Sequence, residues 1–481
     1  MTTQSSPIAK KLRVVCLFAV AAIGTSMAQA DVKLAQVFSE NMVLQRDLPL
    51  PVWGTADAGE EVSVKFEGQS ATTKADDKGL WSVKLKPVKA GGPFAFDVSG
   101  KNKIAFKNVL VGEVWVCSGQ SNMEWSVAAS ANPQEEIANA KYPQIRLFHV
   151  KKTPAVTKQN QLVLESDWRE CSPDTVKSFS AVGYFFGRHI HKELNVPVGL
   201  INSSWGGTRI EPWTTIGGFQ SVESVKAIGQ AAEAQQAKPE GVAANAGQPT
   251  HLYNGMIHAL VPFAMRGALW YQGESNRGEG VAYEYKMHAL INGWRSVWGQ
   301  GDFPFLYVQL APYKYVKPPM TDPQNFLPQI WEAQTKTLAM KNTGMAVITD
   351  ITNLDDIHPK NKQDVGKRLA LWALAKTYGK DVAYSGPLYK SMKVDGNKIR
   401  IEFDHANGLK SRDGKPLSWF TIAGKEGDFV EATATIDGNA VVVSSDKVSD
   451  PAAVRFGWDQ LAEPNLMNAA GLPASPFRTG R

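Results

Sequence analysis

Cysteine, long apolar runs and an excess of one charge are all lacking in this chain of 481 residues. Its three cysteines are far apart, which excludes a small disulfide-stapled fold and a cysteine-rich zinc site. Beyond residue 30, no apolar run approaches the roughly 20 residues that a membrane-spanning helix needs. The 52 basic residues, three of them within the first thirty positions, nearly balance the 46 acidic ones. This balance argues against nucleic acid or an anionic membrane as a partner.

The first thirty residues have the pattern of a secretory signal peptide. Basic residues at positions 10, 11 and 13 precede a short apolar core at 14–23, and Ala-Gln-Ala at 28–30 is a small-x-small cleavage site. We therefore expect cleavage after Ala30 and a periplasmic or secreted protein. In such an oxidising compartment Cys117 and Cys171 either form one disulfide or remain as buried thiols.

Hydrophobic periodicity divides the rest of the chain into three parts. Residues 31–108 carry short alternating strands between turn clusters, a pattern typical of a small β-sandwich. Residues 109–384 alternate strands with helix-like segments, which predicts an α/β domain with a doubly wound parallel sheet covered on both faces. Residues 385–481 return to short strands joined by Asp-Gly and Gly-Asn turns. We therefore expect an α/β domain with all-β segments at both ends.

Polar clusters follow successive strands of the expected α/β domain. Ser121 comes after an apolar run at 111–116, Gly207 after a strand at 198–202, and Gln272 after a strand at 268–271. His358 lies in the loop that follows a strand at 345–349. Ligands of such sheets bind outside the carboxyl ends of the strands, so we expect these residues to meet there.

Ser121 and His358 are the candidate nucleophile and base. Ser121 lies in a small-residue turn between a strand and a helix-compatible segment, a placement that exposes a nucleophile, although the GxSxG spacing is absent. A helix-capping serine is the alternative. Of eight histidines, His358 is the one in a loop after a strand, with Asp355 three residues earlier to orient its ring. The alternative is that His358 faces solvent and that the aspartates of this loop cap the following helix.

Two further positions could stabilise an oxyanion. Gly207, or its neighbour Gly206, can present a backbone N–H with no side chain in the way, unless the pair is a plain turn. The Gln272 amide could donate as well, unless it is a buried amide bonded to a neighbouring loop.

Three residues are candidate contacts for substrate. Arg209 could bind a carboxylate through its guanidinium, or it could pair with Glu211 and shape its own loop. Trp205 could stack on a sugar or belong to the core, and Glu274 could contact substrate or hold its own loop. No residues have the spacing of a metal site.

Four motifs in this order resemble the sialate O-acetylesterase family, the carbohydrate-esterase branch of the SGNH hydrolases. They are GQSNMEW at 119–125, NSSWGGTRIEPW at 202–213, WYQGESN at 270–276 and DIHPKNKQDVG at 356–366. The resemblance runs from about residue 37 to near the end of the chain and implies a flavodoxin-like fold of the SGNH type. It also implies Ser121 as nucleophile, His358 as base, Gly207 and Gln272 as oxyanion donors, and Asp355 as acid. Asp356, Asp350 or a Ser–His dyad without an acid remain alternatives.

The activity implied by this resemblance is a carbohydrate O-acetylesterase that acts through an acetyl-serine intermediate and requires no cofactor. Its partner would be an acetylated sugar, with O-acetyl sialic acid expected first. Two alternatives stay open: an acetyl esterase acting on a plant polysaccharide such as acetylxylan, and a carbohydrate-binding protein that has lost catalysis.

Overall fold

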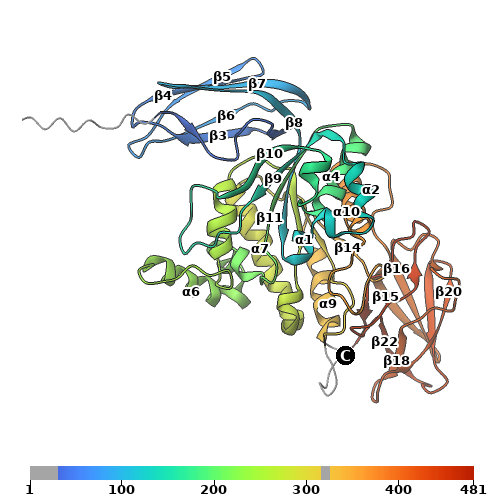
Figure 1. Ribbon diagram of the computed structural model, residues 1–481. Helices are drawn as coiled ribbons and strands as arrows, with labels where there is room; N and C mark the ends of the chain where they lie inside the picture. Colours follow the sequence, from blue (N-terminus) through green and yellow to red (C-terminus); the bar gives the residue numbers. More distant parts are fainter. Residues whose placement is uncertain (1–30, 316–325, 481) are drawn as a thin grey trace, which may run out of the picture.

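The structure is a computed structural model that describes residues 31–315 and 326–480. The expected signal peptide at 1–30 lies outside the described residues. Figure 1 shows a central α/β region with one β unit above it, from the N-terminal part of the chain, and a second β unit at its lower right, from the C-terminal part. The α/β class with added β sheets is therefore confirmed.

The N-terminal β unit is built from strands with alternating buried and exposed residues, as the sequence pattern predicts. One sheet has the order β1-β3-β6, and β4 pairs with both β5 and β7. The strands of this unit are β1 (Lys33–Leu34), β2 (Val43–Gln45), β3 (Leu50–Thr55), β4 (Glu61–Phe66), β5 (Gln69–Lys74), β6 (Leu80–Leu85) and β7 (Gly91–Ser99).

Strand β8 (Lys103–Gly119) belongs to both the N-terminal unit and the central region. Its first half alternates exposed and half-buried residues and pairs with β7, whereas its second half is fully buried and pairs with β11 and β12. The boundary expected at 108/109 falls inside this strand. In its middle, the fully buried Glu113 forms ion pairs with Arg46 and, at 2.7 Å, with Arg266. One strand and one buried charge therefore join the two regions.

The central sheet has the order β10-β9-β11-β8-β12-β13-β14. From β9 to β14 all neighbours are parallel, while β10 runs antiparallel to β9, so the sheet as a whole is mixed rather than wholly parallel. Counted along the chain, β11-β8-β12-β13-β14 have the order 2-1-3-4-5, an order of doubly wound sheets. The order reverses at β8, which places a topological switch point beside its end. The strands are β9 (Tyr142–Val150), β10 (Leu164–Cys171), β11 (Val198–Ser204), β12 (Gly267–Tyr271), β13 (Phe305–Val308) and β14 (Thr343–Ala346).

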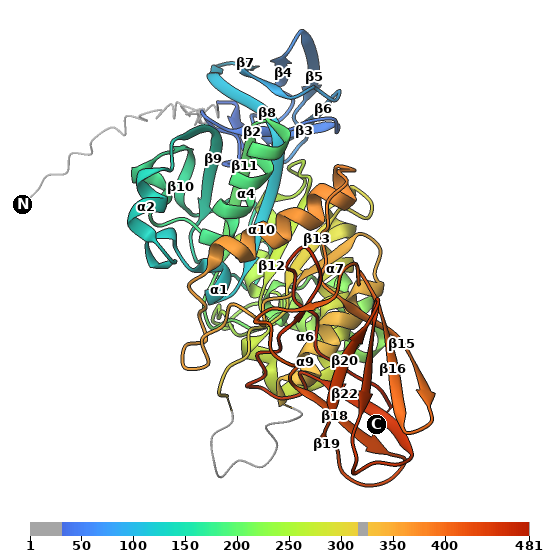
Figure 2. The same ribbon diagram turned by 90° about the vertical axis from the view of Figure 1, so that its right-hand side faces the viewer.

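Helices cover both faces of this sheet. Helices α4 and α10 pack side by side on one face, in front of the sheet in Figure 2, and α7 lies behind it. Helix α4 is one of the helix-like segments expected between the strands, and the side chain of its serine N-cap accepts a hydrogen bond from Gly183 N–H. The helices are α1 (Ser121–Glu124), α2 (Pro133–Ala138), α3 (Pro173–Val176), α4 (Ala181–Leu194), α5 (Ile216–Gln220), α6 (Lys226–Ala237), α7 (Tyr283–Trp298), α9 (Pro328–Lys336) and α10 (Lys362–Trp372).

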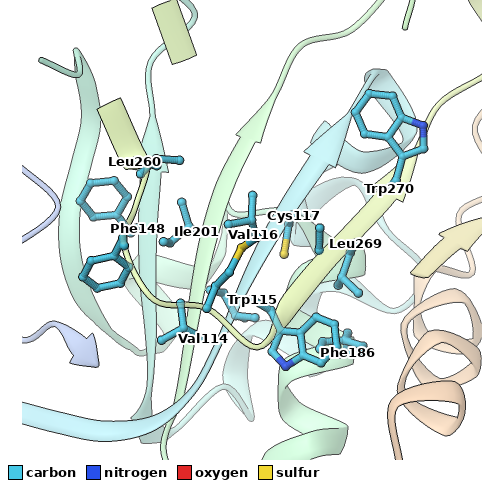
Figure 3. Packing of buried hydrophobic residues seen from close by; sticks show 14 of the residues in the cluster. Val114, Trp115, Val116, Cys117, Phe148, Phe186, Ile201, Leu260, Leu269 and Trp270 are labelled. Atoms are coloured by element: carbon cyan, nitrogen blue, oxygen red, sulfur yellow. The ribbon is translucent and has the colours of Figure 1, made fainter. Parts of the chain in front are cut away.

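The core is centred on the buried half of β8. Figure 3 shows Trp115 beside Phe186 of α4, whose ring centroid lies 4.9 Å away. Cys117 on β8 and Cys171 on β10 are both buried, free thiols. Two strands separate β10 from β8 in the sheet, a span of about 14 Å that no disulfide can bridge. Of the two alternatives for the cysteines, buried thiols are therefore the one observed.

The C-terminal β unit has its own hydrophobic core, formed by two four-stranded sheets. Their orders are β15-β16-β21-β20 and β19-β18-β22-β24. The strands are β15 (Leu388–Asp395), β16 (Lys398–Asp404), β17 (Lys410–Ser411), β18 (Phe420–Gly424), β19 (Val430–Glu431), β20 (Thr433–Asp437), β21 (Ala440–Ser444), β22 (Pro451–Phe456), β23 (Leu466–Met467) and β24 (Phe477–Arg478). Within the described part of the chain, no helix is both long and apolar enough to cross a membrane.

Candidate active site

Ser121 is the first residue of α1 and stands just beyond the end of β8. The turn depends on Gly119, whose φ is 140° and where a Cβ would come within 2.2 Å of the Tyr271 carbonyl oxygen. Gln120 N–H donates to that same oxygen at 3.0 Å, which fixes the turn against β12. As the first helical residue, Ser121 has no helical acceptor for its own N–H. The sequence thus exposes a hydroxyl and a free N–H at the switch point of the sheet.

His358 lies directly against Ser121. Its Nε2 is 2.9 Å from Ser121 Oγ, a hydrogen-bonding distance for a general base. The Trp125 indole stacks on the imidazole, with ring centroids 4.5 Å apart and planes 16° from parallel. Burial, followed by the charge of Lys362, lowers the pKa of His358 below its ordinary 6.5, and the Asp356 carboxylate opposes this shift. The imidazole is therefore held in the neutral form that can accept a proton.

Asp356, and not Asp355, lies beside the imidazole. Asp356 Oδ1 accepts the His358 backbone N–H at 2.9 Å and lies 3.4 Å from Nδ1. Asp355 points away, with 79% of its side chain exposed, and is paired with Lys314 at 2.7 Å. The expected contact between Asp355 and His358 is thus wrong, because the turn capped by Asp356 brings the nearer carboxylate to the ring.

Asp350, the third alternative, is engaged elsewhere. Its two carboxylate oxygens accept hydrogen bonds from the Arg368 guanidinium at 2.6 and 2.7 Å. This bidentate pair holds the loop after β14 to α10.

Gly206 and Gly207 follow β11, and Gly206 adjoins Ser121. A Cβ on Gly206 would lie 3.2 Å from Ser121 Cβ, but the Gly206 N–H already donates to Glu124 Oε2 at 2.6 Å. Gly207 has a φ of 76°, which favours glycine, and its N–H has no hydrogen-bond acceptor among the described residues. Of the two glycines, Gly207 is thus the one with a donor free for an oxyanion.

Comparisons with known proteins identify the family. A family model described as "Carbohydrate esterase, sialic acid-specific acetylesterase" matches residues 111–375. The chain is 30% identical to the sialate O-acetylesterase of Pongo abelii and 31% identical to that of Homo sapiens, and each alignment covers 92% of both sequences. It also resembles the crystal structure of a carbohydrate acetylesterase from Xanthomonas citri, with 40% identity, a TM-score of 0.85, and coverage of 93% of this chain and 99% of that one.

This chain belongs to the sialic acid-specific acetylesterase family of carbohydrate esterases. It is therefore a carboxylic ester hydrolase, which confirms the activity class expected from the four motifs.

Gln272 differs from its expected role in this acetylesterase. The side chain is fully buried, and Nε2 donates to Asn276 Oδ1 at 2.8 Å, to Gln120 Oε1 at 3.1 Å and to the Thr208 carbonyl at 3.2 Å. Its Oε1 accepts the Tyr283 hydroxyl at 2.6 Å. With both amide hydrogens engaged by protein groups, Gln272 holds the loops near Ser121 together and is not placed to donate to an oxyanion.

The three candidate substrate contacts, Arg209, Trp205 and Glu274, lie in three different environments. Arg209 pairs with Glu211 at 3.0 Å and with Glu279, yet 43% of its side chain stays exposed. Trp205 is half-buried, and its backbone N–H donates to Gly119 O at 3.1 Å, which places it beside the turn that carries Ser121. Glu274 is buried, and its Oε1 accepts a hydrogen bond from Asn122, which favours the alternative in which its side chain holds the local structure.

Asn122 and Lys362 are site residues that the sequence analysis missed. The fully buried Lys362 ammonium donates to Asn122 Oδ1 at 2.5 Å, and Asn122 Nδ2 donates to Glu274 Oε1 at 2.5 Å. Burial lowers the pKa of Lys362 from 10.5 to about 7, and it raises the pKa of Glu274. Both residues fall within the motifs at 119–125 and 356–366, but nothing in those segments marks Lys362 as buried. Among the described residues, no group of three or more His, Cys, Asp or Glu side chains could hold a metal ion.

Proposed function

We propose that this chain hydrolyses acetyl esters of sugars through an acetyl-Ser121 intermediate, with O-acetyl sialic acids as its substrates. The observation that carries this proposal is the 2.9 Å contact between His358 Nε2 and Ser121 Oγ at the end of β8. The strand order 2-1-3-4-5 around that strand supports the SGNH type of fold.

In the proposed first step, His358 Nε2 takes the Ser121 hydroxyl proton as Oγ attacks the acetyl carbonyl carbon. Asp356 orients the ring and stabilises the imidazolium that forms. The negative oxygen of the tetrahedral intermediate is met by the N–H groups of Ser121 and Gly207, aided by the amino-terminal end of the first turn of α1. His358 then gives its proton to the sugar oxygen, and that sugar leaves as an alcohol.

The second step repeats this chemistry with water. His358 takes a proton from a water molecule as the water oxygen attacks the acetyl-Ser121 carbonyl. Collapse of the second tetrahedral intermediate returns the proton to Ser121 Oγ and releases acetate. His358 Nε2 therefore carries the proton transferred in each step, and the remaining water proton leaves with the product as acetic acid, which ionises to acetate in solution.

The sugar specificity and the location of the enzyme are part of the proposal. Sialic acid as the sugar is supported by the name of the matching family and by the names of the relatives. The half-buried Trp205 indole and the exposed edge of Arg209 are the proposed contacts for the sugar ring and its carboxylate. Secretion or a periplasmic location is supported by the basic, apolar and small-residue pattern of residues 1–30.

The first test is Ser121→Ala, assayed by acetate release from 4-nitrophenyl acetate. We expect kcat to fall by at least about 10³-fold, because the attacking oxygen is lost while the fold is retained. The matched control is Ser126→Ala, a hydroxyl five positions later that lies outside the proposed chemistry. Equal rates for the two variants would overturn the serine mechanism.

The second test compares O-acetyl sialic acid with acetylated xylan as substrates. We expect kcat/KM to be at least about 10-fold higher for O-acetyl sialic acid, since a carboxylate can meet Arg209. A preference for acetylated xylan would leave the esterase mechanism intact and assign the plant-polysaccharide substrate instead.

A further inference from the structure

The Asn122 side chain is the point at which four segments of the active site meet. It is buried, and its Oδ1 accepts from Lys362 Nζ at 2.5 Å. Its Nδ2 donates both to Glu274 Oε1 at 2.5 Å and to the Ile357 carbonyl at 3.0 Å. Both amide hydrogens and the amide oxygen are therefore bonded to protein, which fixes the orientation of the amide.

The segments joined in this way carry the reacting groups. Asn122 directly follows Ser121, and Ile357 directly precedes His358. The hydrogen bond from Asn122 to Ile357 thus ties the backbone of the base to the residue next to the nucleophile. Lys362 begins α10, just after the loop of His358, and Glu274 begins the segment after β12. Asn122 therefore links α1, α10 and both loops through one amide.

The charges in this cluster make it unlike a simple packing contact. Lys362 is fully buried, and its ammonium lies 5.1 Å from the centre of the Tyr271 ring. Glu274 is also buried, and its Oε2 has no hydrogen-bond partner among the described residues. Buried ionisable groups with incomplete partners destabilise a fold relative to apolar groups of the same size. A purely structural role would be served better by apolar side chains, so the charges themselves call for a function.

We propose that Lys362, Asn122 and Glu274 form a positioning relay that fixes His358 against Ser121, with the buried Lys362 ammonium at one end of it. The relay deepens the proposed esterase function and rests on it. None of the three residues touches the reacting atoms, so they are positioning residues.

The surroundings of the imidazole support an electrostatic role for Lys362. The titratable groups that face His358 are Ser121 on α1, Asp356 on its own loop and Lys362 on α10, with Glu274 behind Asn122. The Lys362 charge lowers the pKa of His358, whereas the Asp356 carboxylate raises it. Charges of opposite sign near one ring allow its affinity for protons to be tuned without a change in its position.

Lys362→Met tests the charge, with Lys360→Met as the matched control because Lys360 is an exposed lysine two positions earlier. The measurement is kcat/KM for 4-nitrophenyl acetate as a function of pH. The acid limb of this pH profile is the range in which kcat/KM falls as His358 becomes protonated. We expect Lys362→Met to move it upward by about 0.5–1 pH unit, because the charge that opposes protonation of His358 is gone. Lys360→Met should overlay the unmodified enzyme. An acid limb of Lys362→Met that coincides with that of Lys360→Met would overturn the charge role.

Asn122→Leu and Glu274→Gln test the geometry. Leucine removes all three hydrogen bonds, whereas glutamine keeps an oxygen that can accept from Asn122. We expect Asn122→Leu to lower kcat by about 10²-fold with little change in KM, the effect of a base displaced by about 1 Å, and Glu274→Gln to lose less than about fivefold. Unchanged kcat in Asn122→Leu would overturn the positioning role.

Titration of Ser121 with a fluorophosphonate makes these tests independent of folding yield, because rates are expressed per labelled serine. Should Asn122→Leu give no folded protein, the rates of Lys362→Met and Glu274→Gln per labelled serine decide the question. Absence of labelling and of acetate release in the unmodified enzyme would refute the esterase function itself. If the unmodified enzyme is labelled normally and releases acetate, but all variants show the same rates and the same acid limb, the positioning relay is refuted and the esterase function is not.

Discussion

Replacement of Asp356 by asparagine, side by side with the same change at Asp355, tests how His358 is oriented. Asp356 Oδ1 lies 3.4 Å from His358 Nδ1, whereas Asp355 is held by Lys314 at 2.7 Å. Both substitutions keep the shape of the side chain and remove one negative charge from the same loop. Each variant is therefore a control for the other.

The magnitude follows from the distance between the charges. At 3.4 Å, a carboxylate and an imidazolium attract each other by about 5 kcal/mol at an effective dielectric constant of 20, and by about 1 kcal/mol in bulk water. Because 37% of the Asp356 side chain is exposed, solvent screens the pair and the lower half of this range applies. We therefore expect Asp356→Asn to lower kcat/KM by about 10- to 100-fold, and Asp355→Asn to change it by less than about threefold.

The assay is the pH dependence of kcat/KM for 4-nitrophenyl acetate. The Asp356 carboxylate raises the pKa of His358, so its removal should move the acid limb to lower pH, opposite in sign to the shift expected for Lys362→Met. A larger loss in Asp355→Asn than in Asp356→Asn would refute this assignment of the acid. Equal, small losses in both would indicate a Ser–His dyad.

Further predictions concern stability and the oxyanion donor. Glu113→Gln should lower the free energy of unfolding by about 3 kcal/mol in urea titrations, because it leaves Arg46 and Arg266 without their shared buried partner. The control Asp167→Asn, which removes one charge of an exposed ion pair, should change it by less than about 1 kcal/mol. The free energy of unfolding of the unmodified enzyme, taken relative to that of Lys362→Met, should rise from pH 7 to pH 10.5, because Lys362 has a pKa of about 7 when folded and 10.5 when unfolded and so binds more protons in the unfolded chain in that window. A difference that does not change with pH would contradict this. Gly207→Ala should lower kcat at least about 10-fold with little effect on KM, since a φ of 76° disfavours alanine and shifts the donor; an unchanged kcat would exclude this N–H as a donor.

The position of the site could be predicted from the sequence because it depends on strand ends. Ser121, Gly207, Gln272 and His358 each follow an apolar run, and parallel strands bring such positions to one edge of the sheet. The structure places all four at that edge. The strands, the helices and their order follow from local hydrophobic periodicity, which is why the location of the site could be predicted.

The roles of individual side chains were less accessible, because they depend on residues distant in the sequence. Asp355 is turned away from His358 by Lys314, which is 41 positions earlier in the chain. The Gln272 amide donates a hydrogen bond to Gln120, 152 positions before it, and Glu274 accepts one from Asn122. Lys362 has the sequence context of an ordinary solvent-exposed lysine in the first turn of a helix, and only the packed structure shows it to be buried. Tertiary contacts such as these leave no local periodicity to detect.

The 17-residue strand β8 has a consequence for how this protein unfolds and where it can be truncated. Because one uninterrupted strand supplies pairing to both the N-terminal β unit and the catalytic sheet, neither can lose that strand without opening a row of hydrogen bonds in the other. The two regions should therefore unfold in a single cooperative transition. A shortened gene that begins after residue 108 would divide β8 and remove Arg46 from Glu113, so a minimal catalytic fragment should retain the whole N-terminal unit.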